Sequence, residues 1–203
     1  MTLRAIVLAA GKGTRMKSAT PKVLHDLCGR PMLWYILASL REAGVDDVVV
    51  VTNDELESSI GEFGVRSIVQ REQLGTGHAV KVALESLDPA EGGRIVVAYG
   101  DMPLVPRDIF RNVIGSLDGD GSDTAMSLVT VRMPLPSNFG RIVRRGENVE
   151  RIVEMRDASS EELGIDEMNA GVYAFNEREL RDAVAALKND NSQKEYYLTD
   201  AVE

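Results

Sequence analysis

Three short runs that are apolar through their centres constrain the fold of this chain more than any other feature. They are Ala5–Ala10, Asp47–Thr52 and Arg94–Tyr99, and helix-like patterns at Pro31–Ala43 and Ala79–Leu87 separate them. Strands that are buried on both faces are typical of mostly parallel sheets covered by helices on each side. The alternation therefore predicts an α/β fold, in which ligands bind beyond the carboxyl ends of the strands.

The second half of the chain has a different rhythm. One clear helix, Asn176–Leu187, occurs there among four strand-like segments: 123–132, 140–144, 149–155 and 169–175. No linker is long enough to separate two independent domains. We therefore predict a single domain over residues 1–203, with a nucleotide-binding core over about 1–120 and a β-rich, substrate-binding part over about 121–203.

Composition excludes several classes of protein. The 203 residues include 32 acidic and 23 basic ones, a net charge of −9, whereas nucleic-acid-binding proteins usually carry a basic face. Cys28 is the only cysteine, which rules out an internal disulfide. Neither a secretory signal pattern nor an apolar stretch of the ~18 residues needed for a membrane span occurs. We expect a soluble cytoplasmic protein with no nucleic-acid and no membrane partner.

Positive charge is nevertheless concentrated near the N-terminus. Residues 1–30 contain a single acidic residue, Asp26, and these basic residues: Arg4, Lys12, Arg15, Lys17, Lys22 and Arg30. Because salt screens charges over roughly 8 Å, a local basic cluster can attract a small anion to an acidic protein.

A glycine-rich loop, Gly11-Lys-Gly13-Thr-Arg15, follows the first predicted strand, and Lys22 comes shortly after it. Glycines let the backbone approach a ligand closely, and the bases can donate charge-assisted hydrogen bonds to phosphate. Met16 replaces the third glycine of a dinucleotide-binding motif, and the Walker pattern is absent as well. The loop predicts a phosphate site; the alternative is a simple turn with surface bases.

Asp101 follows the apolar strand Arg94–Tyr99, at the same edge of the predicted sheet as the glycine loop. A single carboxylate near phosphates commonly shares a magnesium ion with their oxygens. A lone aspartate in this position is more often a turn former or a helix cap. Both interpretations remain open on the residue alone.

Further polar motifs suit a base and a sugar. Gln70 and the segment Gly75-Thr76 precede a helix, and a glutamine amide has both a donor and an acceptor for a base edge. In the β-rich half, Gly140, Glu154 and Asn169 lie in polar segments that suit sugar hydroxyls. Each of these residues taken singly is as consistent with a structural role, Thr76 for example as a helix N-cap.

Catalysis by a covalent intermediate finds little support. Only two histidines are present, no G-x-S-x-G motif occurs, and the single cysteine lacks a catalytic context. Chemistry that depends on positioning and charge neutralisation fits the residues better.

Taken together, seven motifs resemble the pyrophosphorylase domain of the bacterial bifunctional N-acetylglucosamine-1-phosphate uridyltransferase/glucosamine-1-phosphate acetyltransferase family. In chain order they are LAAGKGTRMKS…PKVL, QREQLGTGHA, YGDMPL, NFGRIV, IVEMRDA, EMNAGVYAF and NDNSQKEYYLTD. The resemblance spans nearly the whole chain, from Ile6 to about Asp200.

The resemblance implies a Rossmann-like nucleotidyltransferase fold with a β-rich sugar-binding lobe. It implies that UTP and N-acetylglucosamine 1-phosphate react, with Mg²⁺, to form UDP-N-acetylglucosamine and pyrophosphate. This reaction would supply a precursor for the synthesis of cell-wall peptidoglycan. In the implied site, Arg15 and Lys22 hold the triphosphate and Asp101 ligates the metal. The nucleotide would contact Leu8, Ala9, Ala10, Gly11, Gly13, Gln70, Gly75 and Thr76. The amino sugar would contact Tyr99, Gly140, Glu154 and Asn169.

The chain departs from this family at several points. Ala170 stands where threonine is usual, and Lys194 stands where glycine is common. The second metal ligand of the family, an asparagine in a Gly-Val-Asn segment, is expected beyond Glu203. The same holds for the β-helix acetyltransferase domain, which leaves the oligomeric state open. Two alternatives therefore stand beside the uridyltransferase: a related enzyme that uses glucose 1-phosphate, and a non-catalytic module that binds nucleotide sugars.

Overall fold

The computed structural model describes residues 2–11, 13, 16–118 and 124–202. Its main sheet contains β1 (Leu3–Leu8), β4 (Asp47–Thr52), β5 (Arg66–Val69), β6 (Arg94–Tyr99), β7 (Met126–Arg132), β8 (Arg141–Arg145), β9 (Asn148–Val153) and β10 (Glu167–Asn176). A small two-stranded sheet pairs β2 (Asp26–Leu27) with β3 (Arg30–Pro31). The α-helices are α1 (Met32–Glu42), α2 (Asp54–Ile60), α3 (Thr76–Glu85), α4 (Arg107–Gly115) and α5 (Glu177–Ala186). Short 3-10 helices are η2 (Lys22–Leu24), η3 (Gly61–Phe63), η4 (Ser116–Asp118), η5 (Glu162–Gly164) and η6 (Leu198–Val202).

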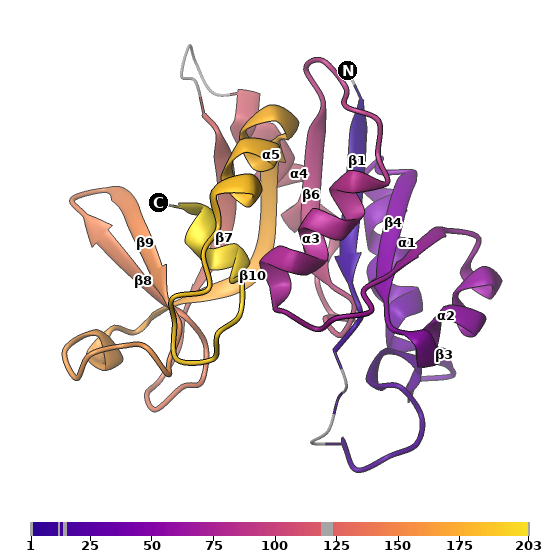
Figure 1. The fold of residues 1–203 in the computed structure, drawn as a ribbon, viewed down its shortest axis with the longest axis horizontal. Helices are drawn as coiled ribbons and strands as arrows, with labels where there is room; N and C mark the ends of the chain where they lie inside the picture. The colour runs from indigo at the N-terminus through magenta and orange to yellow at the C-terminus, as the bar shows by residue number, and fades with distance from the viewer. Residues whose placement is uncertain (1, 12, 14–15, 119–123, 203) are drawn as a thin grey trace.

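The main sheet has the strand order β5-β4-β1-β6-β10-β8-β9, with β7 paired to β10 outside this path. The first four strands are parallel, as predicted, and β10 pairs antiparallel with β6. The β-rich half therefore joins the sheet of the first half through β10, as Figure 1 shows. The two parts share main-chain hydrogen bonds between β6 and β10.

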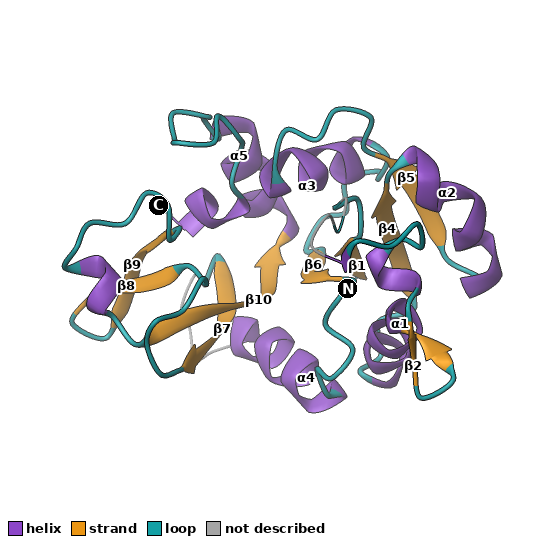
Figure 2. Ribbon diagram, turned by 90° about the horizontal axis from the view of Figure 1, so that it is seen from below, coloured by secondary structure: helices purple, strands orange, loops and turns teal. Residues whose placement is uncertain are grey.

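Two apolar cores lie on opposite faces of the sheet, because successive strand residues point to opposite sides. Val48 and Val50 of β4 belong to the core under α1 and α4, whereas Val49 and Val51 belong to the core under α3 and α5. Figure 2 shows the two helix pairs covering the two faces. This three-layer arrangement explains why the central strands are apolar on both sides.

Two α-helices of the first half were not anticipated from the sequence, α2 and α4. Asn53 caps α2, since its Oδ1 accepts a hydrogen bond of 2.9 Å from the backbone N–H of Leu56. Phe110 and Val113 supply the buried stripe of α4, whose other residues are mostly polar or exposed. In addition, α3 begins at Thr76, three residues earlier than the apolar pattern indicates.

None of the helices formed by the described residues combines the length and the apolar character needed to cross a membrane.

A β-bulge in β10 marks the place where this strand leaves β6. The pairing of β10 with β7 shifts between Asn169 and Tyr173, and Gly171 in between has a φ of +75°. A Cβ atom on Gly171 would lie 2.7 Å from the ring of Tyr99, so only glycine fits this position. The bulge thereby brings Asn169 of the β-rich half next to the end of β6.

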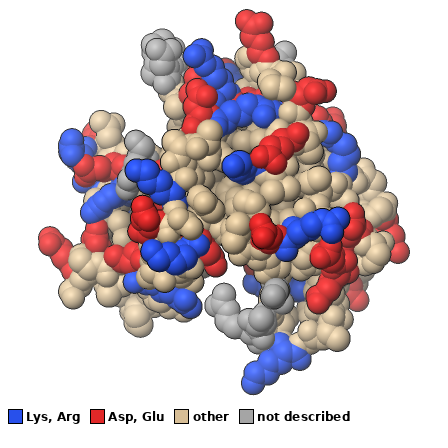
Figure 3. Space-filling view, in the orientation of Figure 1, with Lys and Arg blue, Asp and Glu red and all other residues tan. Residues whose placement is uncertain are grey.

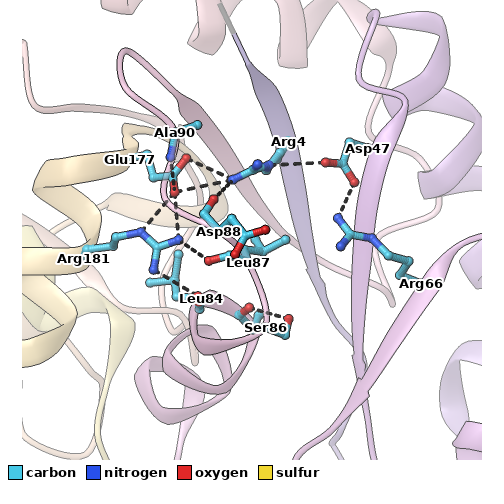
Figure 4. Close-up of polar contacts among 11 residues, drawn as sticks. Arg4, Asp47, Arg66, Leu84, Ser86, Leu87, Asp88, Ala90, Glu177 and Arg181 are labelled. Carbon is cyan, nitrogen blue, oxygen red and sulfur yellow. Dashed lines mark hydrogen bonds and ion pairs between the residues drawn. The ribbon is translucent and has the colours of Figure 1, made fainter.

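Near the amino-terminal end of β1, a buried ion cluster ties α5 to this strand. The side chain of Glu177, only 2% exposed, faces both Arg4, at 3.3 Å, and Arg181, at 2.8 Å. The same carboxylate accepts a hydrogen bond from the backbone N–H of Ala90. Figure 4 shows these groups converging on Glu177, with Asp47 on the far side of Arg4. One carboxylate thus connects elements that are distant in sequence.

A second ion pair fixes the start of β10 and gives folding stability a pH dependence. Arg144 donates hydrogen bonds of 2.7 and 2.8 Å to the buried carboxylate of Glu167, which lowers the pKa of that carboxyl from 4.5 to about 2. A lowered pKa stabilises the folded state above pH 4.5, and the contribution disappears as the pH falls from 4.5 towards 2.

We therefore expect Glu167→Gln to lower the free energy of unfolding at pH 7 by on the order of 3 kcal/mol. The difference from the unmodified chain should shrink steadily in urea unfolding series at pH 7, 4 and 2.5. The exposed Glu161 serves as control, and Glu161→Gln should change the free energy of unfolding by less than about 0.5 kcal/mol at each pH. A constant difference across the three pH values would contradict the expectation.

Candidate functional site

A cavity of about 340 Å³ lies beyond the carboxyl ends of β1 and β6, as predicted for a parallel sheet. Most of the predicted site residues line it: Leu8, Ala9, Ala10, Gly11, Gly13, Lys22, Gln70, Gly75, Thr76, Tyr99 and Asp101. These residues come from five separate stretches of the chain. Arg15, like Lys12 of the same loop, falls outside the described residues.

The path of the glycine loop is fixed from two sides. The carbonyl oxygen of Ala10 accepts hydrogen bonds from Asn53 Nδ2, at 3.2 Å, and from Gln73 Nε2, at 3.0 Å. Gly13 has a φ of +56°, and a Cβ atom there would lie 2.9 Å from Cβ of Lys22. Glycine at this position therefore lets Lys22 pass directly beside the loop.

Lys22 and Asp101 form an ion pair at the cavity wall. Lys22 begins η2, immediately after Pro21, and Asp101 follows the last residues of β6. Both side chains keep about a third of their surface exposed, 36% for Lys22 and 32% for Asp101. The pair is therefore accessible from the cavity, and a bound anion or cation can compete for either partner.

The donor set at Asp101 suits one kind of metal site. Among the described residues, no three acidic, cysteine or histidine side chains gather where they could hold a metal ion. The described residues therefore do not form a metal site made of protein groups alone. One accessible carboxylate fits magnesium, which is usually bound by one or two carboxylates together with substrate phosphates and water.

Gln70 and Gly75 form a compact turn on the other wall of the cavity. Nε2 of the buried Gln70 donates a hydrogen bond of 3.1 Å to the carbonyl oxygen of Gly75. Gly75 has a φ of +108°, and a Cβ atom there would lie 2.5 Å from the carbonyl oxygen of Tyr196. Any other residue would push this turn away from the segment that packs against it.

The predicted sugar-binding residues Gly140, Glu154 and Asn169 do not line this cavity, but they lie together beside it. Asn169 Nδ2 donates a 2.5 Å hydrogen bond to the hydroxyl of Tyr173, and the backbone N–H of Asn169 donates to the carbonyl oxygen of Gly140 at 2.9 Å. Glu154 Oε1 lies 3.5 Å from the position a Cβ atom on Gly140 would take.

Tyr99 connects the two groups of residues. Its side chain lines the cavity and interacts with the hydroxyls of Thr76 and Tyr173. Burial, with the nearby Glu154 carboxylate, raises the pKa of Tyr99 well above its usual value. Burial likewise raises the pKa of Glu154, although the 3.2 Å hydrogen bond from Thr199 opposes this shift. The cluster therefore combines neutral hydroxyls, an amide and one carboxylate, groups that suit sugar hydroxyls and amides.

Several cavity residues were missed by the sequence analysis. Gln73, Val23, Ala79 and Glu195 also line the cavity. Gln73 stands in the same motif as Gln70, so its signal was visible, but the spacing does not show that it holds the glycine loop. Glu195 lies in a motif near the C-terminus, and only the fold brings it to the cavity.

On the face shown in Figure 3, basic and acidic side chains of the described residues are interspersed, and the surface is hollowed between the part with β8 and β9 and the rest. A mixed surface of this kind gives no broad basic area on that face.

Comparison with known proteins agrees with this geometry. The model of the MobA-like NTP transferase domain matches residues 5–200. The bifunctional protein GlmU of Trichlorobacter lovleyi is 45% identical over 203 residues, which is 98% of this chain and 44% of that protein. The bifunctional protein GlmU of Streptomyces avermitilis is 44% identical over 204 residues, 97% of this chain and 42% of that protein. The chain thus spans less than half the length of these relatives.

A solved structure supports the fold independently. A UDP-glucose pyrophosphorylase complexed with UDP-glucose superimposes with a TM-score of 0.79, covering 100% of this chain and 86% of that one, at 16% identity. At such low identity the likeness concerns the fold alone. The predicted α/β nucleotidyltransferase fold is thereby confirmed, as is the resemblance to the bifunctional family.

Proposed function

This chain belongs to the MobA-like NTP transferase family, and on that premise we propose that it transfers a uridylyl group from UTP to N-acetylglucosamine 1-phosphate. The products are UDP-N-acetylglucosamine and pyrophosphate. The curated relatives at 44–45% identity support this choice of substrates. We further propose a cytoplasmic location, in which the product supplies cell-wall precursors.

One observation carries the proposal: an accessible Lys22–Asp101 ion pair lies in the same cavity as the glycine loop. The loop supplies backbone groups for phosphates, and the pair supplies one cation and one metal-binding carboxylate. A site that bound only a neutral sugar would not need both charges beside a glycine turn.

The reaction needs no general base from the protein. The sugar phosphate is an anion that attacks the α-phosphorus directly, and pyrophosphate leaves in line. The chain therefore contributes alignment and charge stabilisation. Lys22 would stand beside the phosphates as a positive charge, and we assign Arg15 to the departing phosphates from its sequence motif.

Asp101 would hold a magnesium ion, which would neutralise charge on the phosphates when it is bound. The nucleotide would lie along Leu8–Gly11 and Gly13, with its base at Gln70, Gly75 and Thr76. The amino sugar would extend from Tyr99 towards Gly140, Glu154 and Asn169.

Pyrophosphate release tests the proposal. The 203-residue chain is incubated with UTP, Mg²⁺ and either N-acetylglucosamine 1-phosphate or glucose 1-phosphate. We expect turnover with the amino sugar to exceed that with glucose 1-phosphate by about 10- to 100-fold in kcat/KM, since an unpaired amide-binding site costs a few kcal/mol.

Equal rates would instead identify a sugar-1-phosphate nucleotidyltransferase of broader specificity. If the chain bound UTP but released no pyrophosphate, it would act as a binding module, and the uridyltransferase proposal would fail for this chain.

A further inference from the structure

Arg141 stands where the strands β8, β9 and β10 meet. In the register of the sheet it lies opposite Met168 of β10 and opposite Val153 of β9. The predicted sugar-binding residues are the direct neighbours of these three residues in sequence: Gly140, Glu154 and Asn169. Each predicted sugar-binding residue is thus one step along the chain from this junction.

The side chain of Arg141 lies on the opposite side of the sheet from these neighbours. Successive strand residues face opposite sides, whereas paired residues of adjacent strands share a side. The next residue, Ile142, belongs to the core that also holds Ile152 and Tyr173, so Arg141 faces the other way. An effect of Arg141 on the sugar-binding residues would therefore pass through the main chain.

The guanidinium of Arg141 is buried and bridges two main-chain carbonyl groups. Only 2% of the residue is exposed. Its Nη1 atom donates a hydrogen bond to the carbonyl oxygen of Phe139, and its Nη2 atom donates one of 2.8 Å to that of Ser137. Among the described residues, no other hydrogen bond reaches the segment 137–139 from outside it. One side chain therefore holds the segment that leads into Gly140.

A buried guanidinium is an unfavourable way to fill this space. Both of its acceptors are neutral carbonyl groups, and the Nε atom of Arg141 has no hydrogen-bond partner among the described residues. A charge buried in this way costs more free energy than an apolar side chain of similar size. Stability alone would favour an apolar residue, whereas the planar fork of arginine can hold two neighbouring carbonyl groups at once.

The main chain at Gly140 is closely packed between the other two predicted sugar-binding residues. Its carbonyl oxygen accepts a hydrogen bond of 2.9 Å from the backbone N–H of Asn169. A Cβ atom on Gly140 would lie 3.0 Å from Cγ2 of Ile152 and 3.5 Å from Oε1 of Glu154. A displacement of residues 137–139 would therefore shift Gly140 relative to both neighbours.

We propose that Arg141 is a positioning residue for the sugar phosphate, because its guanidinium holds the segment that sets Gly140 between Glu154 and Asn169. This inference rests on the proposed function, in which these three residues bind the amino sugar. Arg141 acts on the affinity for the sugar phosphate and leaves the binding of UTP in the cavity unchanged.

The test measures kcat and the KM for N-acetylglucosamine 1-phosphate in pyrophosphate release by the full 203-residue chain, and the dissociation constant of UTP by calorimetry. Arg141→Met fills similar space without donors. Its KM should rise about tenfold, while its UTP constant stays within about twofold, as expected for two hydrogen bonds lost at the sugar-binding residues alone.

Two further variants sharpen the comparison. Arg141→Lys keeps the charge but not the planar fork, so its KM should rise about threefold. Arg145→Met is the matched control on the same strand, since the side chain of Arg145 is 83% exposed, and it should change neither constant.

An arginine with a merely structural role would give a different result. Loss of folded protein lowers the apparent kcat and leaves the KM for the sugar phosphate unchanged. An unchanged KM in Arg141→Met would therefore overturn the inference, as would an equal loss of UTP binding. If Arg141→Met does not fold, Arg141→Lys decides by the same criterion.

Failure of the proposed function would be seen separately. If the unaltered chain released no pyrophosphate, the uridyltransferase proposal would fail. The dissociation constant of UDP-N-acetylglucosamine would then decide the inference: about tenfold weaker binding by Arg141→Met, with unchanged UTP binding, would support it, and equal binding would overturn it.

Discussion

Asp101→Ala is expected to lower the rate of pyrophosphate release at least about a hundredfold, while UTP still binds. The carboxylate is the one acidic group of the ion pair at the cavity wall, and its loss removes the proposed protein ligand of the metal. Its loss also releases Lys22 from its partner. Without Mg²⁺, UTP should therefore bind several-fold tighter to the variant than to the unmodified chain, because a negative charge has gone and a positive one is free.

These opposite effects separate a metal ligand from a merely structural aspartate. Titration of UTP with and without Mg²⁺ measures them, and Asp108→Ala is the control, since that carboxylate is 71% exposed on α4. If Mg²⁺ strengthened UTP binding equally in Asp101→Ala and in the unmodified chain, Asp101 would not hold the metal.

Glu177→Ala is expected to lower the free energy of unfolding by about 3–5 kcal/mol. The substitution leaves the guanidinium groups of Arg4 and Arg181 without their shared carboxylate, and their side chains are only 13% and 25% exposed. The backbone N–H of Ala90 also loses its acceptor. Figure 4 shows that no second carboxylate among the drawn residues reaches Arg181.

Chemical denaturation at pH 7 measures this loss. Glu179→Ala on the same helix is the matched control, because Glu179 is exposed, and it should change stability by less than about 0.5 kcal/mol. Glu177→Gln keeps the shape of the side chain, so its loss of unfolding free energy should lie between those of Glu177→Ala and Glu179→Ala. A loss below about 1 kcal/mol in Glu177→Ala would mean that the arginines find other partners.

The central sheet was predictable because its strands are apolar on both faces, a pattern that surface segments rarely show. β4 and β6 have the bounds expected from the sequence. α2 and α4 were missed for a physical reason: short helices that pack on one side contain few apolar residues, and Leu56 and Ile60 supply all the buried contacts of α2. The antiparallel pairing of β10 with β6 depends on contacts far apart in sequence, which periodicity cannot reveal.

For the site, the sequence identified residues at strand ends more readily than contacts between them. Lys22 and Asp101 were each proposed as neighbours of phosphate, but their direct ion pair became visible only in the fold. Nε2 of Gln70 also lies 3.0 Å from Nδ1 of His78, eight residues further along the chain. No residue pattern indicates this contact across the turn into α3.

The pairing of β10 with β6 has a consequence for the size of molecule that this site can select. Ala98 opposite Val172 links the end of β6, which borders the cavity, to the strand that carries Asn169. Main-chain pairing permits only whole-residue steps of about 3.3 Å, and each single step turns the side chains to the other face. The register of β10 on β6 therefore fixes the distance between the cavity and the residues proposed to bind the sugar. Acceptance of a longer or shorter substrate would have to come from side chains and loops, since the sheet cannot stretch by a fraction of a residue.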